Sequence, residues 1–85
     1  MKISDVKVGM RVVPNKKSYY GGLDSSVVWQ KAKEAKQPYL YVTQKLFERT
    51  GKAYFCLSNI RNDKLENGEP NGDFFLASDF KKFSK

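Results

Sequence analysis

The alternation of apolar and polar positions changes along the chain and predicts mostly strands. Residues 6–14 hold a short apolar lead, a glycine turn and a β-branched segment that stops at Pro14, which predicts a first strand. From Tyr39 onward, apolar and polar side chains alternate with a period of two, as in a strand with both faces partly covered. A hairpin connection at 49–52 then returns the chain as a third strand over 53–60.

The segment between the first two strands predicts a long loop followed by one helix. Residues 15–26 hold a glycine pair and capping residues without a period of their own, which indicates the loop. A helix is expected over 27–36, and Pro38 ends it. Its candidate N-caps are Asp24, Ser25 and Ser26. Its apolar face is formed by Val28, Ala32 and Ala35.

The C-terminal part predicts two more short strands. A polar loop of turn-forming residues at 61–72 leads into a strand at 73–77. A tight turn at 78–80 precedes a final strand at 81–83. Because a chain of 85 residues is too short to divide into two cores, one domain over residues 1–85 is expected. The predicted fold class is mainly β, with one short helix inserted between strands one and two.

This order of elements resembles that of a Src-homology-3-like barrel. The opening Val8-Gly9-x-Arg11-Val12-Val13 resembles the G-x-x-V start of bacterial members, and Ala77-Ser78-Asp79-Phe80 resembles their closing x-x-D-L turn. Tyr20-Gly21-Gly22, Trp29 and Tyr41-Val42 fall in an order similar to that of the cell-wall-binding modules of phage and bacterial lysins. The resemblance implies a small five-stranded barrel. Barrels of this class bind proline-rich peptides, peptidoglycan, DNA, RNA or ribosomal partners, so the fold leaves the ligand open.

The positive charge is concentrated in the first two thirds of the chain. The net charge is +7, from 16 basic and nine acidic residues. Residues 1–55 hold eleven basic and four acidic residues, whereas residues 56–85 hold five of each. Such an asymmetry favours a polyanionic partner. A lysine-rich composition that serves no partner gives the same count, and that interpretation stays open.

Residues that support catalysis or metal binding are scarce. The chain has no histidine, which removes the commonest general base and the commonest metal ligand. Cys56 lies in an apolar strand and is expected to be an inert core thiol. A calcium loop starting at Asp63 fails, because Leu65 and Phe74 occupy ligand positions. We therefore expect no catalytic residue, no metal and no cofactor.

What remains is a set of cations interleaved with aromatic side chains. On single-stranded nucleic acid, such cations neutralise phosphates and such rings stack on bases, so nucleic acid is the leading expected partner. The same surface would suit a cell-wall glycopeptide. A small phage-type protein that binds and modulates a host protein is a third hypothesis. The candidate binding residues are Arg11, Lys16, Lys17, Tyr19, Tyr20, Trp29, Lys31, Lys33 and Lys36.

Packing competes with binding for the aromatic candidates. Trp29, Tyr39 and Tyr41 can all serve as core residues, and a minimal domain often needs one large ring as an anchor. Tyr19 and Tyr20 follow two lysines in a polar loop, where packing demands are weaker. They are therefore the better candidates for exposed rings.

No targeting segment is visible in the sequence. The N-terminus interleaves charged and apolar residues and builds no signal-peptide core. The longest apolar run, residues 53–57, is far shorter than the roughly 20 residues that cross a bilayer. With a single cysteine, no internal disulfide can form. A cytoplasmic protein that contacts no membrane is expected.

Overall fold

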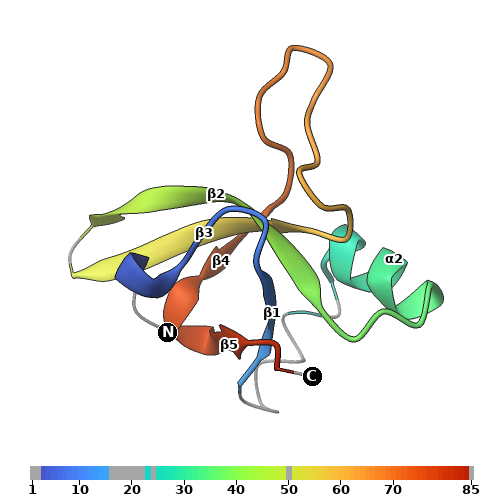
Figure 1. The fold of residues 1–85 in the computed structure, drawn as a ribbon, viewed down its shortest axis with the longest axis horizontal. Coiled ribbons are helices and arrows are strands. Elements are labelled where there is room, and N and C mark those ends of the chain that lie inside the picture. Colours follow the sequence, from blue (N-terminus) through green and yellow to red (C-terminus); the bar gives the residue numbers. More distant parts are fainter. Residues whose placement is uncertain (1–2, 16–22, 24, 50, 85) are drawn as a thin grey trace.

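The computed structural model describes residues 3–15, 23, 25–49 and 51–84, and of residues 3 and 47–49 only the backbone (Figure 1). The strands are β1 (Arg11–Pro14), β2 (Leu40–Arg49), β3 (Lys52–Ser58), β4 (Asp73–Leu76) and β5 (Phe80–Lys82). The α-helix α2 (Val27–Glu34) lies between β1 and β2. The 3-10 turns η1 (Ile3–Asp5) and η3 (Ala77–Asp79) precede β1 and β5.

The strands form an antiparallel sheet in the order β4-β3-β2-β1-β5. This confirms the mainly β class and the helix between the first two strands. Strands β2, β3 and β4 form a meander, and the last strand returns to the free side of β1. In the described part of the chain no hydrogen-bonded ladder joins β4 to β5, so the sheet is open.

The predicted glycine turn precedes β1, which ends at Pro14 as expected. Gly9 has a φ of +94°, in the left-handed region that glycine adopts most easily. Its N–H donates to the carbonyl of Val42 at 2.7 Å, and the Val42 N–H donates to the carbonyl of Met10 at 2.9 Å. These bonds attach the turn to β2 and direct the chain into β1.

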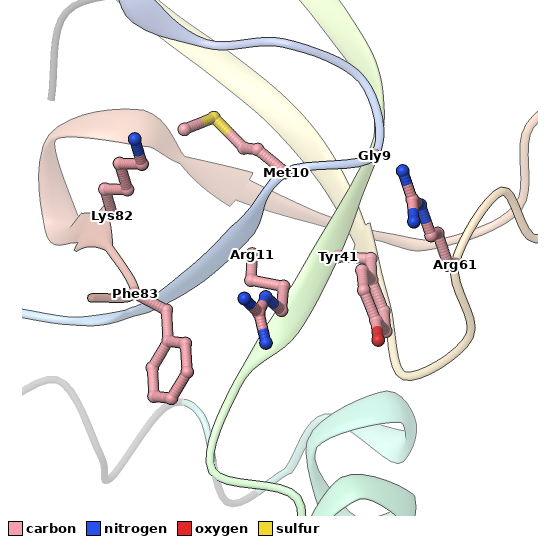
Figure 2. Close-up of a pocket in the computed structure, with 7 residues that line it drawn as sticks. All are labelled: Gly9, Met10, Arg11, Tyr41, Arg61, Lys82 and Phe83. Carbon is pink, nitrogen blue, oxygen red and sulfur yellow. The ribbon is translucent and has the colours of Figure 1, made fainter. Parts of the chain in front are cut away.

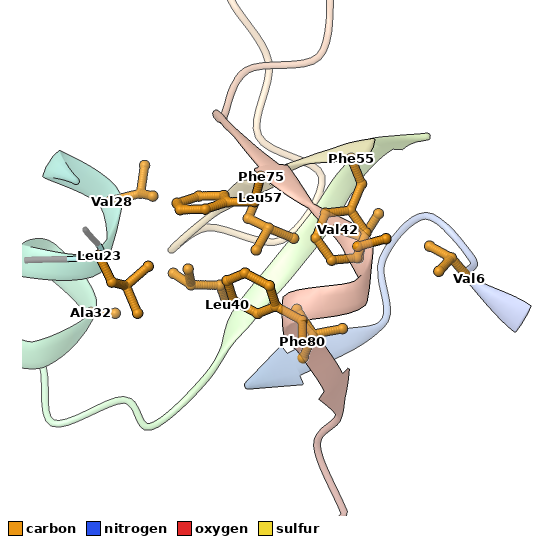
Figure 3. Close-up of a cluster of buried hydrophobic side chains, with 12 residues drawn as sticks. Val6, Leu23, Val28, Ala32, Leu40, Val42, Phe55, Leu57, Phe75 and Phe80 are labelled. Carbon is orange, nitrogen blue, oxygen red and sulfur yellow. The ribbon is translucent and has the colours of Figure 1, made fainter. Parts of the chain in front are cut away.

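The inward-facing residues of the strands build a core on one face of the sheet (Figure 3). Phe80 of β5 packs edge-to-face against Phe55 of β3 and Phe75 of β4, with ring centres 5.6 and 5.3 Å apart. The two halves of the sheet therefore curl around a shared core. Burying one such ring contributes about 1.5–3 kcal/mol. The buried hydrophobic residues are Val6, Val12, Leu23, Val28, Ala32, Leu40, Val42, Phe55, Leu57, Phe75, Ala77 and Phe80.

The N-terminus of α2 is fixed by Ser26, one of the predicted N-caps. Its Oγ accepts a 3.4 Å hydrogen bond from the Trp29 N–H, which satisfies one free donor of the first helical turn. The same hydroxyl donates a 2.6 Å hydrogen bond to Oδ2 of Asp73, at the start of β4. One side chain thus caps the helix and attaches it to the sheet.

The helix ends earlier than predicted, in a Schellman motif. The N–H groups of Lys36 and Gln37 donate to the carbonyls of Lys33 and Ala32. Lys36 has a φ of +58°, which turns the chain away from the helix axis. Ala35, expected on the apolar face, is the C-cap and lies exposed, so this part of the prediction is wrong.

Residues 59–72 form an arm that projects away from the sheet (Figure 1). Asp63 holds its base, because its Oδ2 accepts hydrogen bonds from Ser58 Oγ at 2.7 Å and from Asn71 Nδ2 at 3.1 Å. Beyond it, Lys64 and Pro70 form an isolated β-bridge. The predicted polar loop is therefore an ordered structure closed by its own hydrogen bonds.

Candidate nucleic-acid interface

Three side chains form a row across the outer face of β2, β1 and the end of β5. Val12 of β1 points into the core, so its neighbour Arg11 points to the opposite face. Across the sheet, Arg11 lies opposite Tyr41 of β2. On the other side, Val12 pairs with Lys82 of β5. The next residue, Phe83, lies opposite Arg11 and donates its N–H to the Arg11 carbonyl at 2.9 Å. Backbone pairing therefore fixes the row Tyr41–Arg11–Phe83.

The guanidinium of Arg11 lies over two aromatic rings. Its carbon is 5.1 Å from the centre of the Tyr39 ring and 5.2 Å from the centre of the Phe83 ring. Both distances lie within the roughly 6 Å range of cation–π attraction. The two rings also contact each other, with centres 4.8 Å apart. Arg11 is exposed, so its charge faces solvent while the rings orient it.

Tyr39 and Tyr41 join the row into one cluster. Their rings meet edge-to-face with centres 5.4 Å apart. A hydrogen bond from Tyr41, with a second from Arg11, lowers the pKa of Tyr39. The bond to Tyr39 raises the pKa of Tyr41. The two tyrosine hydroxyls therefore interact with each other, and the charge of Arg11 acts on both.

A pocket of about 390 Å³ lies beside this row (Figure 2). Figure 2 shows the side chains of Arg11, Tyr41 and Phe83 extending to one side of β1, and those of Met10 and Lys82 extending to the other. Among the described residues that line the pocket, three are basic and none is acidic. They are Gly9, Met10, Arg11, Tyr41, Arg61, Lys82 and Phe83.

Arg61 brings a second guanidinium to the pocket from the arm. A Cβ atom placed on Gly9 would lie 3.6 Å from Arg61 Nε, so this side chain packs on the glycine turn. The positive charges of both Arg11 and Arg61 act on the Tyr41 hydroxyl, and each opposes the rise of its pKa. Tyr41 therefore lies between two cations (Figure 2).

A second pocket, of about 540 Å³, adjoins the first. Phe83 and Lys82 line both pockets, so the two share a wall. From α2, Trp29 is half-buried, packs against the core and also lines this pocket. The described lining residues are Val13, Pro14, Trp29, Pro38, Lys81, Lys82, Phe83 and Ser84.

The predicted binding residues fall into three groups. Arg11 lies in the row, and Trp29 is both partial core and pocket wall. Lys33 follows Trp29 by one helical turn and therefore lies on the same flank of α2. Lys31 is rotated about 200° from Trp29 around the helix and lies on the other flank. Lys36 is exposed beyond the helix end. Outside the described residues lie Lys16, Lys17, Tyr19 and Tyr20.

Sequence reasoning missed the contribution of the C-terminal third of the chain. The segment 56–85 has no net charge, so counting charges along the sequence gives no reason to expect a binding surface there. It contains Arg61, Lys82 and Phe83. Strand pairing nevertheless brings Phe83 beside Arg11. One signal was available. Phe80 and Phe83 are three residues apart, so in a strand they point to opposite faces and only one can join the core.

The thiol of Cys56 is not a core residue, contrary to expectation. It is half-buried between Phe55 and Leu57, which take the inward positions of β3. Burial, with a smaller effect from the charge of Asp73, raises its pKa, so little reactive thiolate exists at neutral pH. Among the described residues, no group of three or more histidine, cysteine, aspartate or glutamate side chains could hold a metal ion.

A second aromatic surface lies at the opposite edge of the sheet. The rings of Tyr54 on β3 and Phe74 on β4 are stacked, with centres 4.7 Å apart, and Phe74 is 60% exposed. Neither ring lines either of the two pockets beside the row. This pair offers a matched control for variants of the row.

Comparison of the chain with protein-family models, curated proteins and solved structures found no match. Within the described ranges, no helix is both long enough and apolar enough to cross a membrane. The row and its two pockets are therefore the basis for inferring a function.

Proposed function

We propose that this protein is a non-catalytic module that binds nucleic acid through the surface around the row Tyr41–Arg11–Phe83. The observation that carries the proposal is the placement of Arg11 over Tyr39 and Phe83, with Arg61 in the same pocket. Cations suit phosphates and flat rings suit bases, and nucleic-acid-binding surfaces combine the two. The net charge of +7 adds long-range attraction to a polyanion.

For this module we propose a Src-homology-3-like barrel. The order of the strands and the position of η3 between β4 and β5 support it. Further support comes from β5, which pairs with β1 while its Phe80 packs against Phe55 and Phe75 of the other half of the sheet. These contacts bend the sheet around its core, as a barrel requires.

The rival partners predict different behaviour. A cell-wall glycopeptide would pack on the rings without needing the charge of Arg11, and the protein would sediment with purified cell walls. A protein partner would still be captured from a lysate treated with nuclease, whereas nucleic acid would be lost. We place the protein in the cytoplasm, where its free thiol stays reduced.

The test is fluorescence anisotropy of a labelled oligonucleotide at several salt concentrations. We expect the affinity to fall steeply as salt rises, because each neutralised phosphate releases bound counterions. The double variant Arg11→Gln, Arg61→Gln should weaken binding by at least about tenfold and flatten the salt dependence.

A matched control removes the same charge elsewhere. Lys45 on β2 and Lys64 on the arm are exposed and line neither pocket. The double variant Lys45→Gln, Lys64→Gln should therefore bind far more tightly than the arginine double variant. Binding that ignores salt, or equal weakening by the two double variants, overturns the proposal.

A further inference from the structure

We propose that the row and the second pocket together take a single strand of nucleic acid, with one base held in the pocket between Trp29 and Phe83. This inference rests on the proposed function and names its substrate class. It assigns the phosphates to the first pocket, at Arg11 and Arg61, and the inserted base to the second.

The lining of the second pocket suits a flat, mostly apolar group. Trp29 and Phe83 supply aromatic surface, and Val13 and Pro38 supply aliphatic surface. Lys81 adds a cation at the same site. Aromatic faces stack on any base, so this site requires no particular sequence.

The two pockets follow one another along a continuous aromatic path. Phe83 lines both pockets, its ring contacts that of Tyr39, and the Tyr39 ring contacts that of Tyr41. Arg11 lies over the middle of this path. A strand that follows it meets stacking surface and positive charge alternately, which is the pattern of single-strand binding surfaces.

A duplex cannot use this surface fully. Its bases are stacked and paired, so only its phosphates would reach the cations, and extracting one base costs a few kcal/mol. A single strand presents the faces of its bases without that cost. The second pocket therefore favours single strands over duplexes of the same sequence.

The charge on α2 supports the same path. Lys33 lies one helical turn beyond Trp29, on the same flank of the helix. It is exposed, and it adds a positive charge to the flank of α2 that carries Trp29. The phosphate that follows an inserted base would be attracted by this charge.

Trp29 gives a direct readout, because it is the only tryptophan in the chain. The experiment follows its fluorescence while three probes of about 12 nucleotides are added, a length within the usual site size. The probes are a single strand, an abasic strand with the same phosphates, and a duplex. Anisotropy of the same labelled probes reports binding independently of Trp29.

We expect the single strand alone to quench Trp29 strongly. It should bind about tenfold more tightly than the abasic strand, which is the usual effect of one stacked base. Phe83→Ala should lower single-strand affinity about tenfold and abasic affinity much less, because Tyr39 still lies under the Arg11 guanidinium. Phe74→Ala, the matched variant on the other edge of the sheet, should change the affinity for neither the single strand nor the abasic strand. Thermal unfolding of both variants checks that they fold.

The outcomes separate this inference from the function on which it rests. Salt-sensitive binding that is equal for all three probes, without quenching, overturns the base pocket and leaves the nucleic-acid proposal standing. Absence of binding to every probe in low salt overturns both. If Phe83→Ala fails to fold, Trp29→Phe serves instead, and it should keep most of the discrimination against the abasic strand because phenylalanine also stacks.

Discussion

Phe83 donates its backbone N–H to the carbonyl oxygen of Arg11 at 2.9 Å, and the Arg11 guanidinium carbon lies 5.2 Å from the centre of the Phe83 ring. The two residues are therefore joined twice, once through the backbone and once through their side chains. The backbone bond sets which residue lies beside Arg11, and the ring restricts where its charge points. Such a cation loses less conformational freedom on meeting a phosphate than a free surface lysine does.

Variants of Arg11 should separate its charge from its shape. Arg11→Gln should lower affinity for nucleic acid about tenfold and reduce the slope of log affinity against log salt by roughly 0.7–0.9. Arg11→Lys keeps the charge but loses the planar group that packs on the rings, so its slope should stay and its affinity should fall less. Anisotropy titrations in a salt series measure both quantities. Identical slopes for the two variants would contradict this role.

Ser26→Ala should destabilise the protein by about 1–2 kcal/mol, because the change removes the helix cap. It also leaves Asp73 without its 2.6 Å hydrogen bond from Ser26 Oγ. Urea unfolding measures the effect. Ser84→Ala, at an exposed position near the C-terminus, is the control and should stay within about 0.5 kcal/mol of the parent. A similar value for both variants would show that the cap contributes little.

Gly72→Ala should destabilise the fold by about 1–3 kcal/mol through overpacking. The added Cβ would lie 2.7 Å from the Leu57 carbonyl oxygen and 2.9 Å from Thr43 Oγ1, and the backbone of β3 cannot easily move. Gly68→Ala is the comparison, because nothing lies within 4 Å of its Cβ and only its φ of +88° is unfavourable. The melting temperature of Gly72→Ala should be lower than that of Gly68→Ala. The reverse order would contradict the close approach of Gly72 to the backbone of β3.

Two lysines, one inside α2 and one just beyond its end, should respond in opposite directions to glycine. Lys36 has a φ of +58°, so Lys36→Gly relieves left-handed strain and should raise stability by about 0.5–1 kcal/mol. Lys33 lies inside α2, where glycine costs about 1 kcal/mol relative to a good helix former. Each substitution removes one positive charge, so the free energies of unfolding of the two variants, measured with denaturant, differ through the backbone effect. Destabilisation by both would exclude strain at Lys36.

Cys56 should react slowly with alkylating reagents at neutral pH. Burial raises its pKa above the ordinary value of 9.0, so the inflection of alkylation rate against pH should lie above 9.0. The raised pKa also affects stability. Below about pH 9 the neutral thiol makes its full contribution to the free energy of unfolding. That contribution is lost as the pH rises through the folded-state pKa.

Mass spectrometry after timed alkylation gives the rate for Cys56. For stability, the parent compared with Cys56→Ser isolates the thiol from the tyrosines that titrate in the same range. Rapid alkylation at pH 7 would contradict the half-buried position.

Most strands were predictable because period-two alternation depends on local sequence. Tyr39 to Leu46 alternates, and β2 with its hairpin return follows from it. The helix end was harder, because Ala35 fits an apolar face by spacing and only the φ of Lys36 removes it. Whether the sheet closes depends on contacts between distant segments, such as Phe80 with Phe55, which no local pattern encodes.

The site was predictable only in part, for a related reason. Arg11, Trp29 and the two tyrosines at 39 and 41 come from the segment where charge and rings are dense. Phe83 joins Arg11 through strand pairing, 72 positions further along the chain, and Arg61 of the arm packs on Gly9, 52 positions before it. Net charge counted along a sequence therefore places a binding surface poorly when the last strand returns to the first.

The arm also offers an exposed site for chemical attachment that lies apart from the sheet. Its base is closed by Asp63 and by the bridge between Lys64 and Pro70, so the exposed tip at 66–68 is separated from the core by its own hydrogen bonds. A short epitope or a fluorophore attached there would leave the strand register untouched. The tip is thus a suitable attachment point for immobilising the molecule while the row Tyr41–Arg11–Phe83 stays accessible.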